Sequence, residues 1–304
     1  MLLRPRVLSA GRERLRPAEM RPGRPQPEGV VVVEAAREFK VLVGVAVAPH
    51  RRGCHPRARG GRGRTRPRRP TRGSRFGGVR VAALYDVEGN LPALDAVLAE
   101  VADLRPDVVV FGGDLYCGAQ PVEVIERARA VPNARFVLGN ADRLDDVNVA
   151  YQVAQLRSDQ RDFVAGFPER LVLGDVLYSH GSPRSVDEAV TMLTSDDALR
   201  EMVDGIEQRV IVIGHTHTQF DRRVDGYRIV NAGSVGAAWE KTAGAYWAFV
   251  SGDDVELRRT SYDVDAAIAA LRADDPNREM REAWIRGPHD PHAIAQRLEA
   301  ASGR

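Results

Sequence analysis

Cysteine is scarce in this chain of 304 residues, which contains only Cys54 and Cys117. Two cysteines far apart in the sequence do not make a disulfide framework, so a reducing compartment is expected. Long apolar runs are missing too: no stretch of about 18 uninterrupted apolar residues occurs, which argues against a transmembrane helix. The apolar residues 41–48 are too few to span a bilayer and lie too far from Met1, behind charged residues, to form a signal peptide. We therefore expect a cytoplasmic protein without a membrane partner.

Charge is distributed unevenly along the chain. Residues 1–78 hold 20 Lys and Arg against 5 Asp and Glu, a net charge of +15, whereas residues 79–304 hold 24 basic and 37 acidic residues, a net charge of −13. Eleven arginines lie between Arg51 and Arg75 with few apolar residues among them. Such a segment cannot bury enough surface to offset its ordering entropy, so residues 1–78 are predicted to be disordered.

This basic extension has two interpretations. As an arginine-rich arm it would neutralise nucleic-acid phosphates, and it is the one segment through which a nucleic-acid partner is conceivable. Alternatively it has no selected function, because Arg, Pro, Gly and Ala are what GC-rich DNA encodes when it is read by accident. The apolar pattern of a folded domain begins at Val79, and GTG, a valine codon, is also a common bacterial start codon. We favour this second interpretation, a mis-assigned start near Val79.

From Val79 onward, short apolar runs alternate with segments of helical periodicity. Strands are expected at residues 79–85, 107–111, 135–138, 171–173, 176–179, 210–213, 228–230, 246–250 and 255–261, the last three in a second sheet. Helices are expected at residues 91–104, 121–130, 186–204 and 263–271, with residues 143–167 mostly helical. Helices alternating with strands, followed by a run of strands, predict an α/β protein with mixed sheets.

Six polar side chains follow expected strands, where ligands of α/β proteins bind. They are Asp86, Asp114, Asn140, His180, His215 and His217. The three histidines are the only ones between Val79 and Pro288. Imidazole together with carboxylate suits Mn, Fe, Zn or Ni better than Mg or Ca alone. In an extended His-x-His segment both side chains share one face, so each could serve a different ion.

Five motifs in order carry a resemblance to a known family. They are Asp86-x-x-Gly89-Asn90, Gly112-Gly113-Asp114, Gly139-Asn140-x-Asp142, His180-Gly181 and Gly214-His215-Thr216-His217. In this order they resemble the calcineurin-like metallophosphoesterase superfamily, and in particular its small bacterial phosphodiesterases, over about residues 79–260. The resemblance implies a four-layer αββα sandwich of two mixed β-sheets with flanking helices and a short helical cap. The folded domain is then expected at 79–272, with a cap-like insert at about 143–170 and a C-terminal helical tail at 273–304.

The resemblance also implies a site for two divalent metal ions. Asp86, Asp114 and His217 would hold the first ion. Asp114, Asn140, His180 and His215 would hold the second, with Asp114 bridging the two. Manganese is the expected metal, with Fe, Zn, Ni and Mg as alternatives.

Two positions depart from the family pattern. The first motif reads Asp86-Val87-Glu88 where the family has Asp-x-His, so Glu88 would ligate the first ion through oxygen, favouring Mn or Mg or weaker occupancy. If Glu88 is merely a degraded ligand, Glu88→His should raise activity. Ala141 stands where many members have a histidine that protonates the leaving group, which favours good leaving groups such as aryl esters or nucleotides.

The predicted function is hydrolysis of a small phosphorylated substrate, most simply a phosphodiester, by a hydroxide that two metal ions activate. Asp114, Asn140 and His180 are the expected catalytic residues. Asp142 is either a further site residue, which orients a metal ligand, or a residue that only caps the segment that follows it. Two alternatives remain open. A scaffold protein, like the retromer subunit of this fold, would bind less than one ion per chain, and a nuclease would use residues 51–75 as a DNA arm.

Overall fold

The structure, a computed structural model, describes residues 78–303. The expected disordered extension and its nucleic-acid arm lie outside these residues. The described part forms two five-stranded mixed sheets. The first has the order β10 (Asp254–Thr260), β9 (Ala245–Ser251), β1 (Arg80–Leu84), β2 (Val108–Phe111) and β3 (Ala134–Phe136). The second has the order β4 (Arg170–Leu173), β5 (Val176–Ser179), β6 (Val210–Ile213), β8 (Tyr227–Asn231) and β7 (Phe220–Val224).

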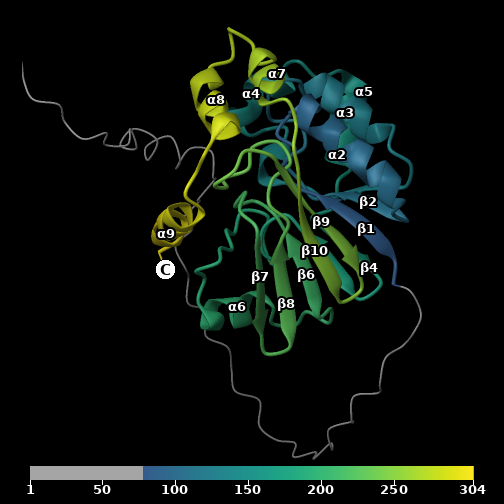
Figure 1. Cartoon of the computed structure of the whole chain (residues 1–304), viewed down its shortest axis with the longest axis vertical. Helices are drawn as coiled ribbons and strands as arrows, with labels where there is room; N and C mark the ends of the chain where they lie inside the picture. The colour runs from purple at the N-terminus through teal and green to yellow at the C-terminus, as the bar shows by residue number, and fades with distance from the viewer. Residues whose placement is uncertain (1–77, 304) are drawn as a thin grey trace, which may run out of the picture. The chain divides into compact units, whose positions relative to one another are not determined.

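Helices cover the outer faces of both sheets. The longer ones are α2 (Leu91–Leu104), α3 (Pro121–Arg129), α5 (Ser158–Ala165), α6 (Asp196–Met202), α7 (Val264–Ala269), α8 (Arg278–Arg286) and α9 (Pro291–Ala301). Shorter turns are η1 (Asn140–Asp142), η2 (Val147–Val149) and α4 (Ala150–Val153). Figure 1 shows α2, α3 and α5 grouped together beside the first sheet, with α6 beside the second. No helix in residues 78–303 is long and apolar enough to cross a membrane.

Alternation along β1 explains the layers. Val81 and Ala83 belong to the apolar cluster between the sheets, while Ala82 and Leu84 belong to the cluster beneath α2 and α3. Successive strand side chains point to opposite faces, so one buried strand supplies two cores. The fully apolar sequence of β1 after its first residue therefore fits a strand covered on both sides. The four-layer α/β sandwich expected from the motifs is the observed architecture.

The assignment of the last strands to a second sheet was wrong. β9 pairs antiparallel with β1, with Val250 opposite Val81, and β10 pairs with β9, so both extend the first sheet. Only β8 belongs to the second sheet, where it lies parallel to β6. Strand periodicity reports which face is buried and carries no information on the pairing partner, which depends on contacts between residues distant in sequence.

Two further expectations differ from the structure. The strand β7 was not expected, because its sequence FDRRV is polar in the middle; it is an edge strand joined to β8 through a turn at Asp225 and Gly226, both at positive φ. The expected helix at 186–204 is reduced to α6. Before it, Thr191 and Thr194 bond to backbone N–H groups and to Glu299, and such local side-chain bonds compete with helix formation.

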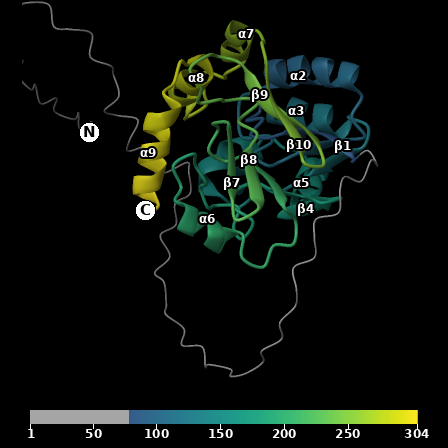
Figure 2. The same cartoon turned by 60° about the horizontal axis from the view of Figure 1, so that its bottom comes forward.

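The C-terminal segment returns to the fold through α7, α8 and α9. Figures 1 and 2 both show α7 and α8 together at one end of the sheets and α9 on the β7 side. Ile294 and Leu298 of α9 pack on Trp239, and Trp284 of α8 packs against the same cluster. The segment therefore contributes side chains close to the ends of β1 and β6.

Candidate metal centre

The six predicted ligand residues lie together at the carboxyl ends of strands from both sheets. Asp86 follows β1, Asp114 follows β2, Asn140 follows β3, His180 follows β5, and His215 and His217 follow β6. Each of the six is at most 4% exposed. Parallel strands present their carboxyl ends at one rim, which brings residues from five separate parts of the chain to one place.

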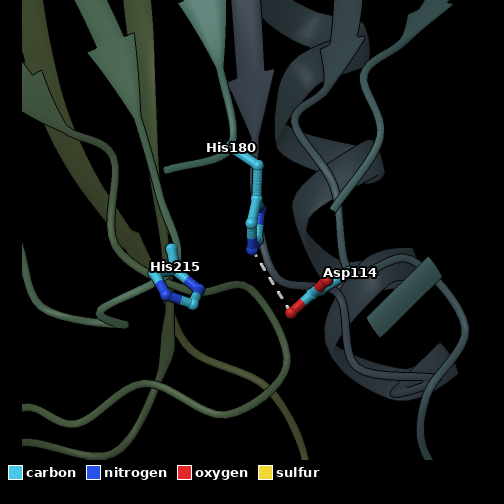
Figure 3. Close-up of side chains that lie close together, drawn as sticks. All are labelled: Asp114, His180 and His215. Carbon is cyan, nitrogen blue, oxygen red and sulfur yellow. Dashed lines mark ion pairs between the residues drawn. The ribbon is translucent and has the colours of Figure 1, made fainter. Parts of the chain in front are cut away.

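Asp114, His180 and His215 form one cluster (Figure 3), in which their ligand atoms lie within 4.8 Å of one another. His180 Nε2 is 3.3 Å from Asp114 Oδ2 and 3.0 Å from Asn140 Oδ1. The rings of His180 and His215 approach edge to face with centroids 5.0 Å apart. This cluster coincides with the residues expected for the second ion.

Asp86, Glu88 and His217 form a second cluster with the same limit of 4.8 Å. His217 Nε2 lies 3.4 Å from both Asp86 Oδ1 and Glu88 Oε1. Glu88 also groups with Asp114 and Cys117, so Asp114 lies between the two clusters. The glutamate thus reaches the position where the family pattern has a histidine.

The hydrogen bonds of the histidines orient their Nε2 atoms toward these clusters. His180 Nδ1 lies 3.0 Å from the carbonyl oxygen of Gly112, and His217 Nδ1 lies 2.8 Å from that of Ala237. A carbonyl only accepts, so Nδ1 is the donor in both rings and Nε2 faces the carboxylates. Backbone carbonyls in this position are typical partners of metal-ligating histidines.

Several polar atoms in the clusters fit a metal ion. Asp86 Oδ1 and His215 Nε2 are buried without a hydrogen-bond partner, which is rare for buried polar atoms. His180 Nε2 and Asn140 Oδ1 face each other at 3.0 Å, and two acceptors at this distance repel unless a proton or a cation lies between them. Imidazole, carboxylate and amide ligands together suit a divalent transition metal.

The pKa values of the three imidazoles reflect the crowded carboxylates. Burial alone would lower the pKa of His180, but Asp114 and Asp86 raise it to about 10. Burial is likewise outweighed at His217, where Asp86 and Glu88 raise the pKa to about 9. The pKa of His215 falls to about 4 through burial and the neighbouring His180. Two imidazoles therefore hold protons against the carboxylates, and binding of cations would release these protons.

The backbone at the clusters is strained. Residues 78–303 include eight non-glycine residues at positive φ, and five of them are candidate ligands. These five are Asp86, Glu88, Asp114, His215 and His217. The left-handed conformation costs about 1–2 kcal/mol per residue and is concentrated at functional sites. The expectation of an extended His-x-His segment was wrong, because both histidines lie in left-handed turns.

A glycine lets two of the loops touch. A Cβ on Gly139 would lie 2.1 Å from Asp114 Oδ1 and 2.3 Å from Asp114 N, closer than any real contact. Glycine is therefore required where the loop after β3 crosses the loop after β2. The Gly112-Gly113-Asp114 and Gly139-Asn140 motifs are thus two sides of one contact.

Asp142 lies beneath the Asp114 loop. Its carboxylate accepts hydrogen bonds from the backbone N–H groups of Asp114, Leu115 and Gly139 at 2.8 to 2.9 Å. Of the two roles left open for Asp142, orientation of a ligand loop is the one this geometry favours. Its position does not support direct contact with a substrate.

Asp142→Asn is expected to weaken metal affinity by roughly 10- to 100-fold, the range for outer partners of metal ligands. An amide has one acceptor oxygen and presents an NH₂ group to donors, so the Asp114 loop loses part of its support. Titration of the chelator-treated protein with Mn²⁺ measures the change. Asp103→Asn, an exposed substitution on α2, serves as the control and should bind like the wild type.

Three cleft residues were not expected from the sequence. Trp239, Arg281 and Trp284 line the cleft together with four of the six residues of the two clusters. Trp239 stacks on His217 with ring centroids 4.4 Å apart. Nothing in the sequence around Arg281 distinguishes it from Arg278 or Arg286 of the same helix.

Two arginines that follow the Asn140 and His180 motifs in the chain pair with carboxylates outside the clusters. Arg143 forms a bidentate pair with Asp187, and Arg184 pairs with Glu188. Neither lines the cleft, whose volume is about 30 Å³. A water molecule needs roughly 10–15 Å³ by this measure, so this volume corresponds to about two particles of the size of a water molecule.

Comparison with known proteins identifies the fold and the family pattern. The model of the calcineurin-like phosphoesterase superfamily domain matches residues 79–253. A metallophosphoesterase structure from Sphaerobacter thermophilus is 23% identical, with a TM-score of 0.57, and the match covers 74% of this chain and 99% of that one. A hypothetical protein from Pyrococcus horikoshii is 18% identical, with a TM-score of 0.54 and coverage of 72% and 97%. None of the curated proteins matches the chain significantly.

Proposed function

Because the chain belongs to the calcineurin-like phosphoesterase superfamily, we propose that it hydrolyses phosphate esters, most simply phosphodiesters, with two bound divalent metal ions. The observation that carries the proposal is the pair of adjacent clusters, Asp114 with His180 and His215, and Asp86 with Glu88 and His217. Each contains a buried polar atom that has no hydrogen-bond partner within the protein. Metal ions would supply these partners.

Each cluster would hold one ion. Asn140 would add a ligand to the cluster of Asp114, His180 and His215, and Asp114 would lie between the two ions. Manganese is the metal we expect, because a site of mixed imidazole and carboxylate ligands with an extra glutamate oxygen is harder than a histidine-rich one. Bound ions would activate a water as nucleophile and neutralise charge on the phosphoryl oxygens.

The protein residues contribute orientation. The carbonyl groups of Gly112 and Ala237 hold the rings of His180 and His217 in place before any ligand binds. The amide of Asn140, buried beside His180, can contact a phosphoryl oxygen without adding charge. Electrostatic groups that are already oriented stabilise developing charge without reorganisation.

Attack by water is favoured over a covalent enzyme intermediate. Cys117 is the cysteine lining the cleft, and burial raises the pKa of its thiol well above the ordinary value. Its Sγ donates to Glu88 Oε2 at 2.9 Å, so it is a protonated donor rather than a nucleophile. Ala141 lines the cleft where a leaving-group acid would stand, which favours substrates with good leaving groups.

The test is hydrolysis of bis-p-nitrophenyl phosphate with Mn²⁺, Mg²⁺, Zn²⁺ or no added metal, followed by a panel of cyclic nucleotides, dinucleoside polyphosphates and monoesters. His215→Ala removes a ligand atom that has no partner within the protein. Equal rates for wild type and His215→Ala, with or without metal, would contradict the proposal.

Metal loading is also expected to stabilise the fold. A ligand present at 100 times its Kd adds about 2.7 kcal/mol to the free energy of unfolding. For a domain of this size the melting temperature of the chelator-treated protein should rise by roughly 5–10 °C on addition of Mn²⁺. Ca²⁺, which prefers oxygen ligands, is the control and should raise it less. Calorimetry that shows no shift with any transition metal would argue against the metal centre.

A second candidate function is a binding scaffold of the same fold with weakened catalysis. The observation in its favour is that Glu88 belongs to the cluster with Asp86 and His217, and that one of its oxygens faces Cys117 and Arg281 rather than these two residues. Elemental analysis after Mn²⁺ loading separates the two functions. Two ions per chain support the enzyme, whereas less than one supports the scaffold.

A further inference from the structure

Arg281 is a buried charge in the cleft that the motifs do not explain. It lies on α8, beyond the residues that the family model matches, and only 4% of its surface is exposed. Arginine is rarely buried to this extent unless it is paired. Arg281 lines the cleft together with Glu88, Asp114 and His217.

The partners of the guanidinium use only part of its capacity. Nη1 donates to the carbonyl oxygen of Cys117, and Nε lies 3.2 Å from Asp275 Oδ2. Nη2 is buried without any hydrogen-bond partner. Arg281 Nη1 is 3.9 Å from Glu88 Oε2, which is longer than a hydrogen bond. A buried guanidinium with unused N–H groups is costly unless an anion completes its hydrogen bonds.

Glu88 lies between this arginine and the other two residues of its cluster, Asp86 and His217. Glu88 Oε1 lies 3.4 Å from His217 Nε2, while Glu88 Oε2 faces Cys117 and Arg281. Only the Glu88 carboxylate therefore separates the guanidinium from the position expected for an ion. An anionic group that reaches the ions also comes within the region that Arg281 lines.

We infer that Arg281 binds the phosphate group of the substrate, through the N–H groups of its guanidinium that have no partner in the protein. The inference rests on the proposed function. Guanidinium matches phosphate oxygens with parallel N–H donors, and such charge-assisted bonds are stronger than neutral ones. The substrate class is then a phosphate ester with at least one ionised oxygen not used by the ions, and the C-terminal segment takes part in binding it.

Binding of inorganic phosphate to the Mn²⁺-loaded protein tests this without turnover. Arg281→Met keeps an unbranched apolar stem and removes the guanidinium with its charge, and is expected to weaken phosphate binding by roughly 10- to 100-fold, as for loss of a charged hydrogen bond. The Mn²⁺ content, measured in the same samples, should stay at the wild-type value. The matched control is Arg286→Met on the same helix, whose side chain is exposed and pairs with Glu282; it should bind phosphate like the wild type.

Each outcome decides the inference. Wild-type phosphate affinity in Arg281→Met would overturn it, and so would a loss of Mn²⁺, because Arg281 would then act only by positioning Glu88. If Arg281→Met does not fold, Arg281→Lys decides: it keeps the charge without the planar fork, and phosphate affinity equal to the wild type would overturn the inference. Weaker phosphate binding in Arg281→Met with no metal-dependent hydrolysis by the wild type would show that Arg281 binds phosphate and would refute the proposed function, so that the phosphate would belong to a ligand that is not hydrolysed.

Discussion

Asp114→Asn is expected to lower metal-dependent hydrolysis by roughly 1,000-fold, about 4 kcal/mol in the activation barrier. Asp114 lies between the two clusters and, among residues 78–303, it alone belongs both to a group with His180 and His215 and to a group with Glu88. Asparagine keeps the shape and can still accept the hydrogen bond from Ala141 N–H at 2.8 Å. The fold should therefore survive while the shared charge is lost.

Steady-state rates and metal content together check this prediction. Asp103→Asn removes a carboxylate from the exposed side of α2 and should leave both unchanged. An Asp114→Asn protein that binds two ions and turns over at the wild-type rate would show that Asp114 is not shared between metal positions.

Glu88→His is expected to destabilise the folded protein by about 2 kcal/mol and to leave activity no higher than in the wild type. Removing one partner of a buried ion pair costs about 3–5 kcal/mol. The destabilisation expected for Glu88→His is smaller than this range, because Asp275 still faces Arg281 when Glu88 is replaced. Burial raises the pKa of Glu88 to about 7, with His217 opposing that shift and Asp114 adding to it. The Glu88 carboxylate contacts His217 with one oxygen and faces Arg281 with the other. An imidazole at position 88 cannot replace both contacts, because it carries no negative charge.

Urea unfolding and the hydrolysis rate measure the two parts of this prediction. Glu88→Gln is the matched variant, because it keeps the length of the side chain and loses only its charge. A Glu88→His protein that is as stable as the wild type and more active would restore the interpretation of Glu88 as a degraded ligand. In that case the contact between Glu88 and Arg281 would have no role.

Local pattern was enough to place most candidate ligands. The strands β1, β2, β5 and β6 are short, mostly apolar runs, and each is followed within a few residues by Asp86, Asp114, His180 or the pair His215 and His217. Because the carboxyl ends of parallel strands share a rim, the meeting of these residues could be predicted without knowing any contact. The same reasoning located Asn140 after β3.

Other features depended on pairings that local pattern does not encode. β9 and β10 have good strand periodicity, yet their place in the first sheet is decided by the match between β9 and β1. The edge strand β7 has a polar middle and needs β8 as its partner to exist as a strand. The left-handed turns at His215 and His217 follow from the crowding of loops at the rim, not from their own propensities.

The sequence by itself determined the α/β class, the positions of most strands along the chain and the candidate ligand residues, because apolar periodicity and strand-end chemistry are local. Only the tertiary structure decided the sheet of β9 and β10, the position of Asp142 beneath the Asp114 loop, and the entry of Arg281 into the cleft. Arg281 is separated from Glu88 by nearly the whole folded domain in sequence, and their approach to 3.9 Å results from the packing of α8 near the strand ends. Contacts of this kind are set by long-range packing, which a residue's sequence neighbours do not specify.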